Sequence, residues 1–116
     1  FDDLRVVKRK YIDVEIAEKV QTPEKFTLHQ NYPNPFNPHT TIQYELAPGS
    51  HHVKLAIYDV TGKLVQTLVN HEQHGGSYSV SWDGRNNSGK PVASGIYIYR
   101  LYAEKHVQSK RMILLH

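Results

Sequence analysis

Apolar and polar residues alternate with a period of two along nearly the whole chain, and this pattern constrains the fold more than any other feature. Residues 41–46 place Ile42, Tyr44 and Leu46 on one side and polar residues on the other. The same alternation recurs in residues 77–82, where serines separate the apolar side chains. No segment shows the period of about 3.6 residues that is typical of an amphipathic helix. The chain is therefore predicted to be all-β, with strands that bury one face.

The strand-like runs from Phe26 to the C-terminus are short and are separated by turn-forming residues. Gly62 belongs to a tight turn, Gly75 and Gly76 are predicted to form another, and the last hairpin falls at residues 104–106. Counting the runs gives about seven antiparallel strands. Short strands with such turns predict an immunoglobulin-like Greek-key β-sandwich of two packed sheets.

Residues 1–20 also alternate, but Pro23 interrupts the pattern before the next strand-like run begins. Two interpretations are open: an extra strand of the same domain, or the tail of a preceding β domain. We favour the second, with a linker over residues 21–25 and the main domain over residues 26–116. Because the chain begins with Phe1 and shows no signal segment, we expect it to be the C-terminal portion of a longer protein.

A proline-rich segment stands directly before the strand-like run of residues 41–46 and reads NYPNPFNP. Proline fixes φ and has no backbone N–H, so this segment, called here the proline strap (Asn31–Pro38), is predicted to resist joining a sheet. We expect the strap to lie across the sandwich with Tyr32 and Phe36 anchored in the core. It would cover a sheet edge, offer a rigid surface to a partner, or do both.

Composition and charge exclude several classes of function. The formal net charge of +3 is small and dispersed, and the tightest basic run, residues 8–10, reads as a solvated strand face, so no nucleic-acid binding is expected. Without cysteines the chain forms no disulfide, thiolate nucleophile or Cys-based zinc site. No apolar run approaches the roughly 20 residues that span a bilayer, so no membrane insertion is expected.

No residue pattern marks an activated nucleophile or an acid–base pair. The only adjacent carboxylates, Asp2 and Asp3, would point to opposite faces of a strand. The Gly75-Gly76 pair lacks the following lysine and helix of a phosphate-binding loop. The chain is therefore predicted not to be an enzyme and to need no cofactor.

The eight histidines raise the question of a metal site. His51 and His52 would diverge on a strand, because neighbouring side chains point to opposite faces. His71 and His74 are three residues apart but fall in a predicted turn, and neither pair of histidines has the cysteine or carboxylate companions of a convincing zinc site. Exposed loop histidines are the favoured interpretation, and no metal ligand is predicted among them.

The loop after residue 82 contains Asp83, Asn86 and Asn87, whose oxygens could bind calcium. Arg85 occupies the third position of that loop and no glutamate closes it, so the EF-hand pattern is not met. Turn formation by Asp and Asn side chains explains these residues without an ion.

Carbohydrate binding is an alternative function, because β-sandwiches can stack sugars on exposed aromatic rings. Tyr58, Tyr97, Tyr99 and Tyr102 would supply such a platform. Tyr97 and Tyr99 share a strand face with Leu101, however, which equally indicates packing in the core. The sequence leaves open which face is exposed.

Four segments carry a resemblance to a known family. They read LHQNYPNPFNPHTTIQYEL, VKLAIYDVTGKLVQTLVN, GSYSVSWDGRNNSGKPVASGIYIYRLYA and SKRMILL. In this order they resemble the type A C-terminal sorting domains of the type IX secretion system, over about residues 26–116. The second half is also similar to the immunoglobulin-like domain of flagellar hook-capping proteins. The proline strap favours the sorting domain.

The resemblance implies a non-catalytic transport signal on a larger, covalently linked N-terminal cargo domain. The cargo would cross the periplasm and outer membrane of a Gram-negative bacterium and be secreted or attached to the cell surface. The implied partners are the type IX translocon and a sortase-like peptidase that cuts in the linker. The linker residues are Val20, Gln21, Thr22, Pro23, Glu24 and Lys25.

The residues that match the family's motif positions are the candidates for translocon recognition. They are Asn31, Tyr32, Pro33, Asn34, Pro35, Phe36, Asn37, Pro38, Asp59, Gly62, Gly95, Lys110 and Arg111. His116 departs from the basic residue that usually ends such tails. A structural or carbohydrate-binding immunoglobulin-like module of an extracellular enzyme remains the alternative, and the sequence leaves open whether copies pair through edge strands.

Overall fold

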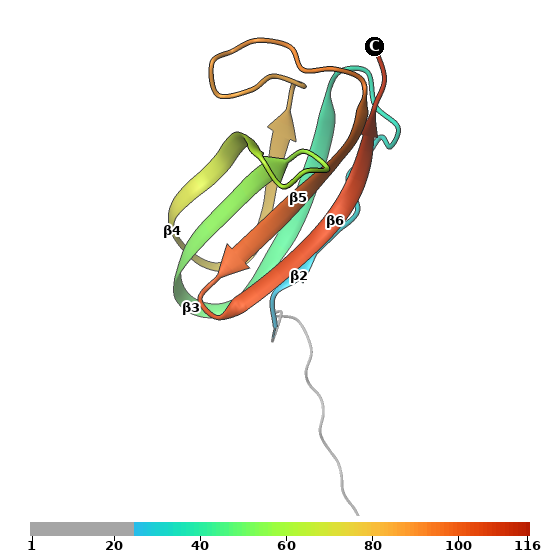
Figure 1. The fold of residues 1–116 in the computed structure, drawn as a ribbon. Coiled ribbons are helices and arrows are strands. Elements are labelled where there is room, and N and C mark those ends of the chain that lie inside the picture. Colours follow the sequence, from blue (N-terminus) through green and yellow to red (C-terminus); the bar gives the residue numbers. More distant parts are fainter. Residues whose placement is uncertain (1–24) are drawn as a thin grey trace, which may run out of the picture.

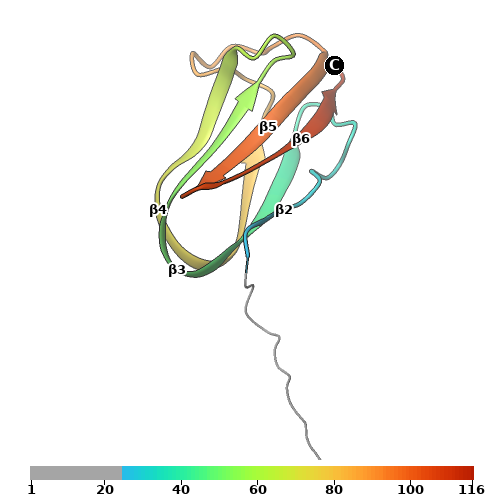
Figure 2. The same cartoon turned by 60° about the horizontal axis from the view of Figure 1, so that its bottom comes forward.

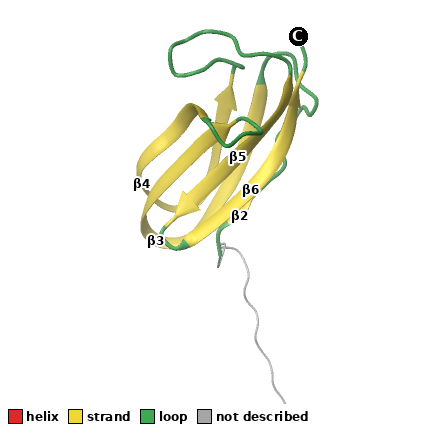
Figure 3. Ribbon diagram, in the orientation of Figure 1, coloured by secondary structure: helices red, strands yellow, loops and turns green. Residues whose placement is uncertain are grey.

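A computed structural model describes residues 25–116, and this part of the chain contains strands and no helix (Figure 3). Five strands follow one another along the sequence: β2 (Thr27–Leu28), β3 (Thr40–Tyr58), β4 (Leu64–Trp82), β5 (Gly95–Ala103) and β6 (His106–Leu114). All pairs of strands are antiparallel. No helix that could cross a membrane exists within residues 25–116. The predicted all-β class is confirmed.

The long β3–β4 hairpin folds over on itself and so builds both layers of the sandwich (Figures 1 and 2). In the first layer, β2 and residues 76–82 of β4 flank residues 40–46 of β3. In the second layer, residues 50–58 of β3 lie between the start of β4 and β5, and β6 follows β5. This topology matches the predicted immunoglobulin-like arrangement.

The structure has five strands in residues 25–116, so the predicted count of about seven is corrected. Both β3 and β4 continue through the bend, so the turn predicted at Gly75 and Gly76 is wrong. A Cβ atom at Gly75 would lie 2.5 Å from the carbonyl oxygen of Ala47 and 2.7 Å from Cα of Pro48. Glycine is required there because the backbones of β3 and β4 lie too close together to leave room for a Cβ atom.

The core consists of the apolar side chains that alternate along each strand. Ile42, Tyr44 and Leu46 are buried, as the period of two predicts. The other large, fully buried side chains are Phe36, Val53, Leu55, Ile57, Trp82, Tyr99, Leu101, Met112 and Leu114. β5 is a central strand because it pairs with both β3 and β6, which explains why its sequence is apolar.

Two of the three predicted turns lie at the ends of hairpins. Residues 59–63 connect β3 to β4, and Gly62 adopts a φ of 88°. Residues 104–105 connect β5 to β6, with Ala103 paired to His106. The tail at residues 1–20 and most of the predicted cleavage linker, residues 20–24, lie outside the described part of the chain.

Candidate functional site

The proline strap runs alongside the C-terminal end of β6 and covers the outer edge of this strand. The amide of Phe36 donates to the carbonyl oxygen of Ile113 at 3.0 Å, and the amide of Leu115 donates to that of Phe36 at 2.9 Å. The side-chain oxygen of Asn34 accepts the amide of Ile113 at 2.9 Å. In the described residues the strap forms only isolated bridges to Thr41 and Leu114, as expected for a segment with three prolines.

Asn31 anchors the start of the strap in the sandwich, although its amide side chain gave no reason to predict burial. It is buried, and its side-chain nitrogen donates to Thr40 Oγ1 at 2.9 Å and to the carbonyl oxygen of Pro33 at 3.1 Å. Its backbone amide donates to the Tyr99 hydroxyl at 2.8 Å, and this hydroxyl donates to the carbonyl oxygen of His29 at 2.7 Å. Burial raises the pKa of Tyr99 to about 12.

Phe36 and Tyr32 occupy opposite environments, and the prediction for Tyr32 was wrong. Phe36 is 2% exposed and its ring centroid lies 5.7 Å from that of Trp82. Tyr32 is 80% exposed. Asn31 already faces the core, and the next side chain of this extended segment therefore points outward, while the backbone of Tyr32 exchanges two hydrogen bonds of 2.9 Å with Thr41.

Asp59 and Gly62 lie in the β3–β4 turn, which the Asp59 carboxylate organises. One carboxylate oxygen accepts the amides of Thr61 at 2.9 Å and Lys63 at 3.0 Å, and also the Thr61 hydroxyl at 2.6 Å. The hydroxyl and amide donors lower the pKa of Asp59. Formation of the turn accounts for both residues.

The sandwich topology brings several of the sequence-predicted residues to one end. Gly95 opens β5, is paired with Leu114, and has a φ of 153°. Since Phe36 bridges to the same Leu114, the strap, Gly95 and the end of β6 meet there. His116 is held at this end by its backbone amide, which donates to Ser94 Oγ at 3.0 Å, and by its ring, 2.6 Å from the carbonyl oxygen of Val92.

An open groove of about 390 Å³ lies between the proline strap and the outer part of β5 and β6. Its lining residues are Gln30, Asn34, Ile96, Lys110, Arg111 and Ile113. It therefore joins the strap to the two basic residues that the family's motif singled out. Gln30, Ile96 and Ile113 were not among the predicted site residues, because only the fold brings them together.

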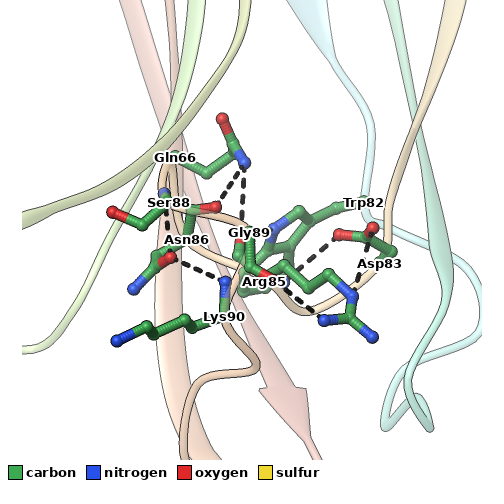
Figure 4. A network of polar contacts seen from close by, with 8 residues as sticks. All are labelled: Gln66, Trp82, Asp83, Arg85, Asn86, Ser88, Gly89 and Lys90. Carbon is green, nitrogen blue, oxygen red and sulfur yellow. Dashed lines mark hydrogen bonds and ion pairs between the residues drawn. The ribbon is translucent and has the colours of Figure 1, made fainter.

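The oxygens of the loop at residues 83–90 accept hydrogen bonds from the protein itself, both within the loop and from Gln66 and Trp82 (Figure 4). Asn86 Oδ1 accepts the amides of Ser88 and Lys90, each at 3.0 Å. Asp83 Oδ1 accepts the amide of Arg85 at 3.2 Å. Within residues 25–116 no group of three or more metal-ligating side chains gathers. The turn-forming role predicted for these Asp and Asn side chains agrees with this network.

The predicted turn around His71 and His74 is corrected, because both residues lie within the continuous strand β4. On a strand, positions three apart point to opposite faces. His71 pairs with Val53 in the register, and His74 pairs with Ser50.

The four tyrosines of the proposed sugar platform do not share one surface. Tyr97 and Tyr99 are buried in the core. Tyr58 and Tyr102 lie half-buried on the outer face of the second layer, where their hydroxyl oxygens are 3.1 Å apart. The platform of four rings is therefore excluded, since a β-strand sends alternate side chains to opposite faces.

The fold and its closed core define the described residues as an immunoglobulin-like β-sandwich. The family model of the FlgD Ig-like domain matches residues 37–106, more than half of the chain. The chain therefore belongs to the FlgD Ig-like domain family. No curated protein matches it.

Three solved structures have a similar fold. Dimeric latent PorU from Porphyromonas gingivalis has a TM-score of 0.64 and 22% identity, with 88% of this chain and 10% of PorU covered. PorZ, an essential surface component of the type IX secretion system of the same bacterium, has a TM-score of 0.54 and 27% identity, with 77% and 11% covered. FlgD from P. aeruginosa has a TM-score of 0.51 and 24% identity, with 65% and 57% covered. The chain thus spans about a tenth of PorU and PorZ.

Proposed function

We propose that this domain is a non-catalytic sorting signal that directs a covalently linked cargo through the type IX secretion system. The observation that carries the proposal is the joining of the strap to the C-terminal strand: Phe36 exchanges backbone hydrogen bonds with Ile113 and Leu115. Two segments with family motifs, far apart in sequence, thereby present one continuous surface that a translocon subunit can bind without unfolding the domain.

Two further observations support the proposal. The order of the motifs along the sequence resembles that of type A sorting domains. PorZ, which has a similar fold at 27% identity, is a surface component of that secretion system. In this proposal the cargo is secreted or attached to the surface of a Gram-negative bacterium, and a sortase-like peptidase cuts within residues 20–25. The domain itself binds no cofactor.

Tyr32 offers a direct test because its side chain is exposed while its backbone holds the strap. Residues 1–116 are fused to the C-terminus of a periplasm-targeted fluorescent protein, in a host with the translocon and in a translocon-deleted strain. We expect export that depends on the translocon and that decreases in Tyr32→Ala. Val107→Ala, exposed at the opposite end of β6, serves as the matched control and retains export.

Point variants are preferable to deletion of the C-terminal strand. Removing residues 110–116 would also remove the buried Met112 and Leu114, so loss of export could reflect unfolding. Retention of the folded fusion in the periplasm of both strains would contradict the sorting role. That result would favour a purely structural immunoglobulin-like module, which membership in the FlgD Ig-like family also fits.

A further inference from the structure

The outer face of the second layer carries cations in adjacent rows. The register places Tyr58 opposite Ile98, and Ile98 opposite Arg111. The neighbouring row places Arg100 opposite Ser109, and a further row contains Lys54. Because these positions alternate with the buried ones, Lys54, Arg100 and Arg111 all point away from the core.

Two of these cations are held in place by the protein itself. The guanidinium carbon of Arg100 lies 5.6 Å from the Tyr58 ring centroid, and Arg100 Nε donates to Ser109 Oγ at 2.9 Å. The ammonium of Lys54 lies 5.6 Å from the Tyr102 ring centroid. Because these contacts already order the Arg100 and Lys54 side chains, less side-chain entropy is lost when a partner binds them.

The groove continues this face toward the strap and adds amides and aliphatic side chains. Lys110 and Arg111 line it together with Ile96 and Ile113. Asn34 also lines it, and since its side-chain oxygen accepts the amide of Ile113, its NH₂ group remains a donor.

Within the described residues, the cations of this surface are not paired with carboxylates of the protein. In residues 25–116 none of the four cations, Lys54, Arg100, Lys110 and Arg111, forms an ion pair with a carboxylate. Asp59 lies near the same end, but its carboxylate accepts hydrogen bonds from its own turn. Glu104 lies in the β5–β6 turn, at the other end of β6 from the groove.

We propose that the groove and the adjoining cationic face bind an extended acidic peptide segment of the sorting partner. Carboxylates of that segment pair with Arg111, Lys110 and Arg100, and one aliphatic side chain packs on the adjacent side chains of Ile96 and Ile113. The Tyr58 and Tyr102 rings are already covered by cations, so the surface lacks the free aromatic faces on which nucleic-acid bases stack. This inference rests on the proposed function, since it names the partner of the same surface.

The test measures binding of a fluorescein-labelled peptide of alternating Glu and Val to the chain of residues 1–116 by anisotropy. We expect binding that weakens with salt, and a loss of about tenfold in affinity in Arg111→Glu. Lys105→Glu, an exposed charge reversal in the β5–β6 turn, is the matched control and changes affinity less than about twofold. Arg100→Gln is a second, milder variant with the same direction of effect.

Three results would overturn the inference. The first is equal binding of a control peptide that alternates Gln and Val. The second is a loss of affinity in Lys105→Glu as large as that in Arg111→Glu. The third is equally tight binding of single-stranded DNA, which would indicate a general polyanion patch. Circular dichroism verifies that each variant is folded. In the secretion assay, normal export of Arg111→Glu overturns the acidic-segment inference while the sorting function stands. Peptide binding without translocon-dependent export would show that the surface binds acidic peptides and that the proposed sorting function is wrong.

Discussion

Tyr99 joins three parts of the chain through one hydroxyl group. Its ring is buried on β5, and its hydroxyl bonds to the backbone of both Asn31 and His29. Tyr99→Phe removes this oxygen and leaves a buried amide and a carbonyl without their partner. We expect a loss of about 1–3 kcal/mol in the free energy of unfolding, measured by urea denaturation. An unchanged midpoint would show that water replaces the hydroxyl.

The raised pKa of Tyr99 also predicts a dependence of stability on pH. The unfolded chain loses this proton near pH 10, whereas the folded protein loses it near 12. Between these values the folded state binds more protons, so the free energy of unfolding decreases as pH rises, by up to about 3 kcal/mol. The decrease should be smaller in Tyr99→Phe. Parallel curves for the two proteins would contradict the assignment to Tyr99.

Single residues in the strap show where sequence-based prediction reaches its limit. Burial of Phe36 was predicted correctly, because a large aromatic side chain in a stiff segment is stabilised by a core. Tyr32 was placed wrongly, since the direction of its side chain depends on Asn31 facing inward toward Thr40. That contact joins residues whose proximity only the folded chain establishes.

At the scale of elements, the bend of the β3–β4 hairpin depends on Gly75. Gly75→Ala places a Cβ atom within 2.5–2.9 Å of the backbone of Ala47 and Pro48, and backbone atoms cannot move aside cheaply. We expect destabilisation of at least about 1–3 kcal/mol, seen as a lower urea midpoint. Ser77→Ala, an exposed substitution just beyond the bend, is the control and should change stability by less than about 0.5 kcal/mol. Equal stability of both variants would show that the bend relaxes freely.

The same bend explains why the class of fold was predictable and the number of strands was not. Alternation determines which side chains face the core, and Ile42, Tyr44 and Leu46 were placed correctly on this basis. A glycine that ends a strand and a glycine that lets a strand bend look alike in sequence. Gly75 is of the second kind, so the ladder continues from one layer into the other.

At the scale of the whole molecule, the candidate site is assembled from segments that are distant in sequence. Gln30 donates to the carbonyl oxygen of Arg111 at 2.7 Å, and Asn34 accepts the amide of Ile113. Family motifs identified the strap and the basic pair separately, but neither periodicity nor spacing indicated that they share a groove. That information lies in the parallel course of the strap and β6, which only the folded topology fixes.

The same topology predicts that residues 25–116 fold on their own. In the described structure the core extends from Phe26 to Leu114, and the strap closes the edge of β6 within these limits. A fragment of residues 25–116 should therefore unfold cooperatively, with a Tm within about 2 °C of that of residues 1–116, because about 1 kcal/mol shifts the Tm of a domain of this size by roughly 4–8 °C. Calorimetry of the two chains provides the comparison. A Tm lower by 5 °C or more would mean that residues 1–24 contribute a strand to this domain, and the linker predicted at residues 21–25 would then be wrong.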